Sequence, residues 1–92
     1  MKKNAREVLE GMRKMKTGLL EAIRERGLPA PTFIQGYYLW WLCGANYLMF
    51  ECTEDGLTAS RGAAGEAPLS ITDIVDIPYA VVLCNEFHGW PM

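Results

Sequence analysis

Hydrophobic positions in the first 26 residues recur with the period of an α-helix. The stripe runs at spacings of three and four residues through Ala5, Val8, Met12, Met15, Leu19 and Ala22, with Leu9 and Ile23 widening it. Such a stripe turns one side of a helix toward a core and leaves the other side polar. Asn4 can cap the start, and Gly27 followed by Pro29 is a stop signal. The pattern predicts a helix over residues 4–26, about 35 Å long at 1.5 Å per residue and longer than a small domain is wide.

Two glycines, Gly11 and Gly18, lie on one side of this predicted helix. Each costs roughly 1 kcal/mol relative to alanine in a helix interior. Two interpretations follow. The glycines are neutral in a helix held by tertiary contacts, or they mark points where a backbone or a ring approaches closely.

From residue 33 onward the pattern becomes that of β-strands. Seven of the ten aromatic residues lie between Phe33 and Phe50. Turn signals at 44–46 and at Asp55-Gly56 divide the region into three predicted antiparallel strands, Ile34–Cys43, Tyr47–Thr53 and Leu57–Arg61. The first is apolar on both faces, and such a strand is normally covered on both faces.

The last third of the chain has a weaker pattern. We predict a loop over 62–68, a short helix over 70–76 capped by Ser70, a strand over Tyr79–Cys84 and an irregular tail from His88. A helix over 71–87, bent at Pro78, fits the same apolar spacing, because short apolar runs do not separate helix from strand.

Together these elements predict one two-layer α+β domain of 92 residues. A long N-terminal helix packs on a small antiparallel sheet of three to four strands, accompanied by a short second helix. The expected segments are the helix at 4–26, an aromatic-rich β-meander at 33–61, and a short helix, last strand and tail at 69–92.

Charge is unevenly distributed between the helix and the rest of the chain. Eight of the nine basic residues lie in the first 26 positions, whereas Arg61 is the single basic residue beyond them. We therefore expect the basic helix and the acidic body to attract each other. The helix also carries acids, and the pI is about 5.3, which argues against nucleic-acid binding.

The run from Gly27 to Phe50 carries no charge and is long enough to cross a bilayer. Its prolines and polar residues, and its tyrosines and tryptophans at the centre, conflict with a membrane span. The odd number of cysteines and the absence of a secretory signal favour a reducing compartment. We therefore predict a cytoplasmic location.

Three groups of side chains have the types that carry chemistry. Cys43, Cys52, Cys84 and His88 are the ligand set of a Cys3His zinc site, but no two cysteines have zinc-knuckle spacing. Cys84, Glu86 and His88 are the types of an activated thiolate, although such partners usually meet only in the fold. Glu51, Glu54 and Asp55 can serve as paired carboxylates, yet at a hairpin end they are typical solvated residues. We predict no metal, no cofactor and no catalytic residue.

The aromatic residues exceed what one helix can cover, so a second element, a second copy or a partner must cover the rest. The expected binding residues are Tyr37, Tyr38, Trp40, Trp41, Tyr47 and Trp90. The leading hypothesis is a non-catalytic interaction protein that forms a homodimer or binds a protein partner through this surface. One alternative is a small-ligand binder with Trp40, Trp41 and Tyr47 lining a cleft for an apolar or aromatic ligand. The other is an enzyme or metal protein that uses Cys84 and His88.

Overall fold

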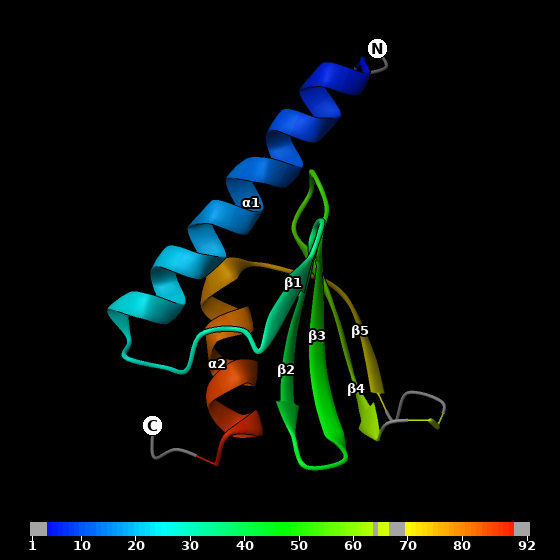
Figure 1. Cartoon of the computed structure of the whole chain (residues 1–92). Coiled ribbons are helices and arrows are strands. Elements are labelled where there is room, and N and C mark those ends of the chain that lie inside the picture. The colour runs from blue at the N-terminus through cyan, green and yellow to red at the C-terminus, as the bar shows by residue number, and fades with distance from the viewer. Residues whose placement is uncertain (1–3, 64, 67–69, 90–92) are drawn as a thin grey trace.

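A computed structural model of the chain describes residues 4–63, 65–66 and 70–89, with the backbone alone for residues 70–73. Two helices flank five strands in chain order (Figure 1). The elements are α1 (Ala5–Glu25), β1 (Phe33–Gln35), β2 (Tyr38–Cys43), β3 (Asn46–Cys52), β4 (Leu57–Ala63), β5 (Ser70–Val75) and α2 (Ile77–Phe87).

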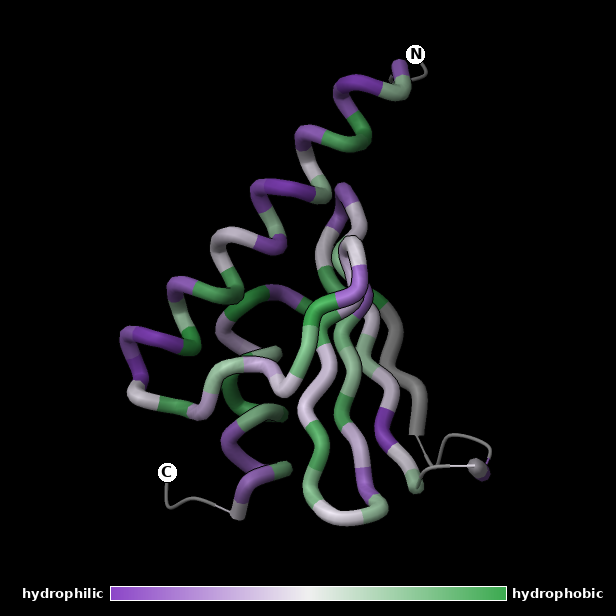
Figure 2. The backbone as a smooth tube through the Cα atoms, in the orientation of Figure 1, coloured by the Kyte–Doolittle hydropathy of each residue, from purple (hydrophilic) through white to green (hydrophobic). Residues whose placement is uncertain are grey.

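Helix α1 begins and ends where the sequence predicts, to within a residue. The Asn4 side chain caps it by accepting a hydrogen bond from the backbone N–H of Glu7 at 2.9 Å. Gly27, with φ of 68°, turns the chain away after the last turn. Leu19 and Ile23 in the second half are buried, whereas the first half extends past the sheet (Figure 1). Its hydrophobic and hydrophilic positions alternate along the whole length (Figure 2).

The five strands form an antiparallel meander in the order β1-β2-β3-β4-β5. The sequence predicts one strand over 34–43, and that prediction is wrong. Gly36 has a φ of 60°, so the chain reverses there and Phe33 pairs with Trp40. A left-handed backbone suits glycine because it has no Cβ. The result is a short edge strand, β1, beside β2.

The order of the last two elements is the reverse of the prediction. Residues predicted as a short helix form β5, which pairs with β4 through Leu57 and Val75. The predicted strand over Tyr79–Cys84 lies inside α2. The alternative helix over 71–87 is right only from Ile77 onward. Two local signals explain this end of the chain.

The first signal is the start of α2. The Asp76 carboxylate accepts a hydrogen bond from the backbone N–H of Tyr79 at 2.9 Å, and Pro78 stands in the first turn. Proline has no N–H to lose there, and its fixed φ suits a helix start. The second signal is the β-branched composition of Ser70–Val75, which favours a strand.

Both helices cover the same face of the sheet, which gives two layers (Figure 1). The core between the layers is formed by Leu19, Ile23, Leu28, Leu39, Trp41, Leu48, Phe50, Cys52, Leu57, Ala59, Val75, Ala80, Val81, Cys84 and Phe87. The linker after α1 is tied to this core, because the Trp41 indole Nε1 donates to the Pro29 carbonyl at 2.8 Å. The predicted two-layer α+β fold is confirmed, with five strands in place of three or four.

Both glycines of α1 mark close approaches. A Cβ on Gly11 would lie 3.0 Å from Glu54 Cβ in the β3–β4 turn, and one on Gly18 would lie 2.7 Å from Ile77 Cδ1 at the start of α2. Helix α1 therefore passes close to the β3–β4 turn at Gly11 and close to α2 at Gly18, the two positions where it has no side chain. Close approach is therefore the correct alternative, by the Glu54 backbone and side chain at Gly11 and by the Ile77 side chain, not a ring or a backbone, at Gly18. Among the described residues no helix is long and apolar enough to cross a membrane.

Candidate functional site

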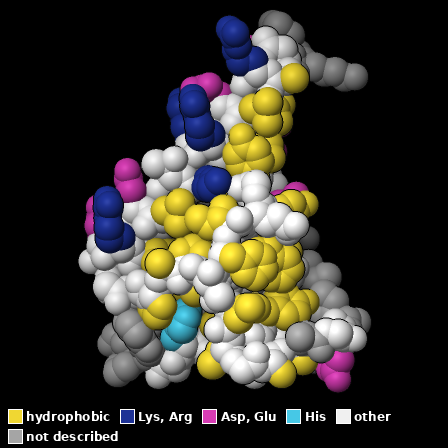
Figure 3. Space-filling model, viewed as in Figure 1, with side chains coloured by type: hydrophobic (Ala, Val, Ile, Leu, Met, Phe, Trp, Pro, Cys, Tyr) yellow, Lys and Arg dark blue, Asp and Glu magenta, His cyan; other side chains and the backbone are white. Residues whose placement is uncertain are grey.

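The sheet face opposite the helices carries a group of large apolar side chains. Strand alternation places Leu39, Trp41, Leu48 and Phe50 toward the helices, and their neighbours in β2 and β3 toward the other side. We call this group the aromatic face, and it consists of Phe33, Tyr38, Trp40, Leu42, Tyr47 and Met49. Phe33 is 43% exposed and Leu42 is 47% exposed. Hydrophobic side chains gather visibly over strands β1 to β3 (Figure 3).

The rings of the aromatic face pack on one another in a row. Phe33 stacks on Trp40 with centroids 5.5 Å apart and planes 13° apart, and Trp40 meets Tyr47 at 5.6 Å with a 52° tilt. Aromatic pairs at these separations attract each other beyond their buried area. Three strands thus hold the rings in a fixed arrangement, which lowers the entropy that is lost when a surface is bound.

One end of the aromatic face is polar. The Glu51 carboxylate accepts hydrogen bonds from the Tyr38 hydroxyl and the Thr58 hydroxyl, each at 3.4 Å. These three side chains come from adjacent strands of the sheet. A surface with an apolar centre and a polar margin is the usual anatomy of a protein interface.

Trp40 contains a polar group without a partner. Its indole Nε1 is buried, and no acceptor within the described part of the chain forms a hydrogen bond with it. A buried donor left unpaired costs roughly 1–3 kcal/mol. Trp41, the next residue, has its own donor satisfied by Pro29. The two tryptophans are therefore distinct: Trp41 completes the core with its donor satisfied, and Trp40 lies on the aromatic face with a buried donor that is not.

The structure separates the six residues that were predicted to form the binding surface. Tyr38, Trp40 and Tyr47 lie together on the aromatic face. Trp41 is 1% exposed and belongs to the core, so it is unavailable to a partner in this fold. Tyr37 lies in the β1–β2 turn, where its ring is under the Lys16 ammonium of α1 at 5.7 Å. Trp90 lies outside the described residues.

Sequence reasoning missed Phe33, Leu42 and Met49 as members of the aromatic face. Leu42 and Met49 follow from simple alternation with Trp40 once the exposed side of β2 is known. Phe33 joins them because the chain reverses at Gly36. The Gly36-Tyr37 pair inside an otherwise apolar run was the available signal for that turn.

The geometry of Cys84 and His88 does not support an activated thiol. The thiol Sγ lies 3.7 Å from His88 Nδ1, but the same nitrogen lies 2.8 Å from the Cys84 carbonyl oxygen. Nδ1 therefore donates its proton to that carbonyl and does not take one from the thiol. Burial raises the pKa of Cys84 to about 12, so the thiol stays protonated at neutral pH.

The other cysteines and carboxylates do not meet at one site either. Cys43 is exposed at the end of β2, whereas Cys52 is buried in β3, where desolvation raises its pKa to about 11. Within 4–63, 65–66 and 74–89, where side chains are described, no three metal-ligating groups gather around a point. Asp55 belongs to a turn that the Thr53 hydroxyl holds by accepting from the backbone N–H groups of Asp55 and Gly56.

Five clefts in the described part of the chain are lined by residues other than Trp40, Trp41 and Tyr47. None of these five clefts lies at the position that the small-ligand hypothesis needs. Comparison with known protein families, with curated proteins and with solved structures finds no match to this chain.

Proposed function

We propose that this chain is a non-catalytic interaction protein whose aromatic face packs against the same face of a second copy. The observation that carries the proposal is the row of packed rings on a sheet face that neither helix covers. Both copies would present the same patch, which is the arrangement of a two-fold symmetric dimer.

The chain exposes more surface than a monomer of its mass usually does. The accessible surface is 5939 Å². A monomer of 10.3 kDa is expected to expose roughly 5,400 Å² by the scaling of area with mass. The overhanging half of α1 and the exposed side chains of the aromatic face both contribute to this larger surface.

The chemistry of the face also suits a second copy. Two antiparallel sheets stack with their faces about 10 Å apart, and the side chains between them interdigitate. The centre of the face consists of Trp40, Leu42, Tyr47 and Met49, none of which is charged, so that two copies meet without opposed like charges.

A matched pair of variants tests this proposal. Leu42 lies on the aromatic face and is 47% exposed, and Leu9 lies on α1 and is 49% exposed. Leu42→Glu would place two uncompensated carboxylates in a symmetric interface and should weaken association by about a hundredfold or more. Leu9→Glu adds the same charge elsewhere and should leave association unchanged.

The measurement is sedimentation velocity of both variants over a range of concentrations, with circular dichroism to confirm that each folds. Selective loss of the dimer in Leu42→Glu is the expected result. Equal association of the two variants would refute the use of this face. Loss of the dimer in Leu9→Glu alone would place the interface on α1.

A further inference from the structure

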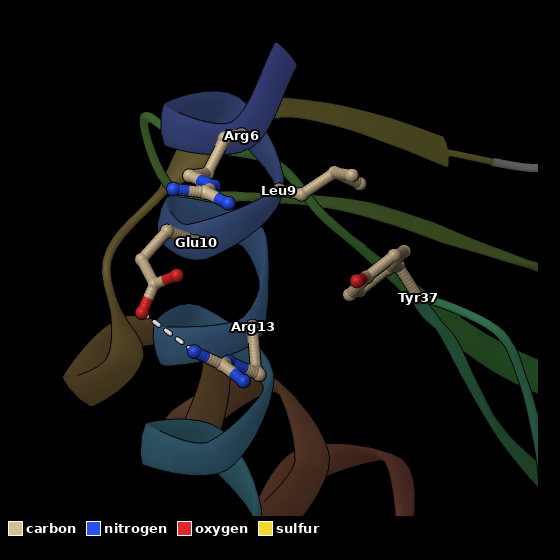
Figure 4. A pocket seen from close by; sticks show the side chains of 5 residues that line it. All are labelled: Arg6, Leu9, Glu10, Arg13 and Tyr37. Carbon is tan, nitrogen blue, oxygen red and sulfur yellow. Dashed lines mark hydrogen bonds and ion pairs between the residues drawn. The ribbon is translucent and has the colours of Figure 1, made fainter.

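A cleft opens between the first half of α1 and the β1–β2 turn. Its volume is about 290 Å³, and its lining residues are Arg6, Leu9, Glu10, Arg13 and Tyr37. Leu9 and Tyr37 point toward each other from the helix and from the turn (Figure 4). The cleft thus joins two segments that are far apart in the sequence, and it does not depend on pairing through the aromatic face.

The cleft has an excess of positive charge. Arg6, Glu10 and Arg13 recur at spacings of four and three, which places them along one side of α1. Glu10 forms an ion pair with Arg13 and so holds that guanidinium in place. Arg6 has no ion pair or hydrogen bond to another described residue. A guanidinium has five N–H donors in a planar fork, so both arginines keep donors for an anion.

The turn side of the cleft is held in position from α1. The Lys16 ammonium donates to the Gly36 carbonyl at 2.8 Å and lies over the Tyr37 ring. The Tyr37 ring therefore has a fixed place beside the cleft, and the Lys16 ammonium adds a third cation nearby. Opposite the ring, Leu9 is an exposed aliphatic group. An apolar group that fills the space between these two side chains removes their apolar surface from water, and this lowers the free energy.

We propose that this cleft binds a small aromatic anion, with its ring between Leu9 and Tyr37 and its carboxylate or phosphate on Arg6 and Arg13. A bidentate contact between a guanidinium and an oxyanion is among the stronger polar contacts in proteins. The apolar walls select for a ring, and the two arginines select for negative charge. Neither feature alone defines the site.

Phenyl phosphate is the probe that tests this proposal, with phenol and inorganic phosphate as the two halves of its chemistry. Binding is followed by the NMR shifts of the Tyr37 ring and the Leu9 methyl groups in the intact chain. We expect saturable binding of phenyl phosphate at Tyr37 and Leu9, and binding at least about tenfold weaker for each half.

Arg6→Ala and Arg13→Ala should each weaken phenyl phosphate binding by about tenfold, the usual effect of one charge-assisted contact. Arg24→Ala removes the same charge from the last turn of α1 and should change nothing. All three side chains are exposed, so the fold should be retained. The proposal is overturned if phenyl phosphate does not saturate these signals, if inorganic phosphate binds as tightly, or if the three variants behave alike.

Discussion

The neighbouring residues Trp40 and Trp41 should differ in how much the same substitution, to phenylalanine, changes the stability of the fold. Trp41 fills the core against Phe50, with ring centroids 5.7 Å apart in an edge-on contact. Trp41→Phe removes its 2.8 Å hydrogen bond to Pro29, worth about 1 kcal/mol. It also leaves a small void, worth a further ~1–2 kcal/mol. The expected loss of stability is therefore ~2–3 kcal/mol.

Trp40→Phe also shortens an aromatic side chain, but it removes a donor that has no acceptor. Relief of that buried N–H offsets the lost ring contact, so we expect the free energy of unfolding to change by less than about 1 kcal/mol. Both variants are compared in urea at a chain concentration low enough for the wild type to be monomeric. Trp41→Phe should lower the midpoint by about 1–2 M, with little change for Trp40→Phe. Equal destabilisation by the two would refute the assignment of their faces.

Three further predictions concern a turn glycine and the cysteines. Gly56 has a φ of 154°, and a Cβ there would lie 2.5 Å from Ile74 Cγ2 and 2.8 Å from the Val75 carbonyl oxygen. Gly56→Ala should lower the free energy of unfolding by ~2–4 kcal/mol, measured by thermal or urea unfolding. Gly44→Ala is the control: a Cβ at Gly44 would point into open space, so the loss should be only about 1 kcal/mol. Similar losses in the two variants would contradict the close approach of β5 to Gly56. A thiol reagent at pH 8 should label Cys43 at once and Cys52 and Cys84 only on unfolding, which mass spectrometry of the labelled chain would show. The pKa values of the two buried thiols are raised from 9.0 to about 11 and about 12. Because the thiols of the unfolded chain ionise at lower pH than those of the folded chain, the free energy of unfolding should stay constant up to about pH 9 and fall above it. A Cys52→Ala, Cys84→Ala double variant should lose this fall, and an equally steep fall of its free energy of unfolding with pH would contradict the assignment.

The first helix was predictable because three independent signals agree over its length. Its apolar period, the Asn4 cap and the stop at Gly27 all indicate the same bounds. The two glycines inside it were a further clue, and both contacts they imply exist. We expected the basic helix to attract the acids of the body. At Lys16, the helix instead contacts a carbonyl oxygen and an aromatic ring.

The faces of the sheet were harder to predict from the sequence. Alternation shows that Trp40 and Trp41 point in opposite directions, but both are apolar, so composition does not tell which one faces the core. The tertiary contact to Pro29 decides it. At the C-terminal end, the local signal of Asp76 and Pro78 was stronger than the β-branched run that follows. Short apolar segments take the structure that their caps and neighbours impose.

The measurement that tests the central claim most directly is sedimentation equilibrium of the unaltered chain at tens of micromolar. Pairing through the aromatic face predicts a mass near twice the 10.3 kDa of one chain, which falls toward one chain on dilution. A single species of 10.3 kDa across the whole range would contradict it.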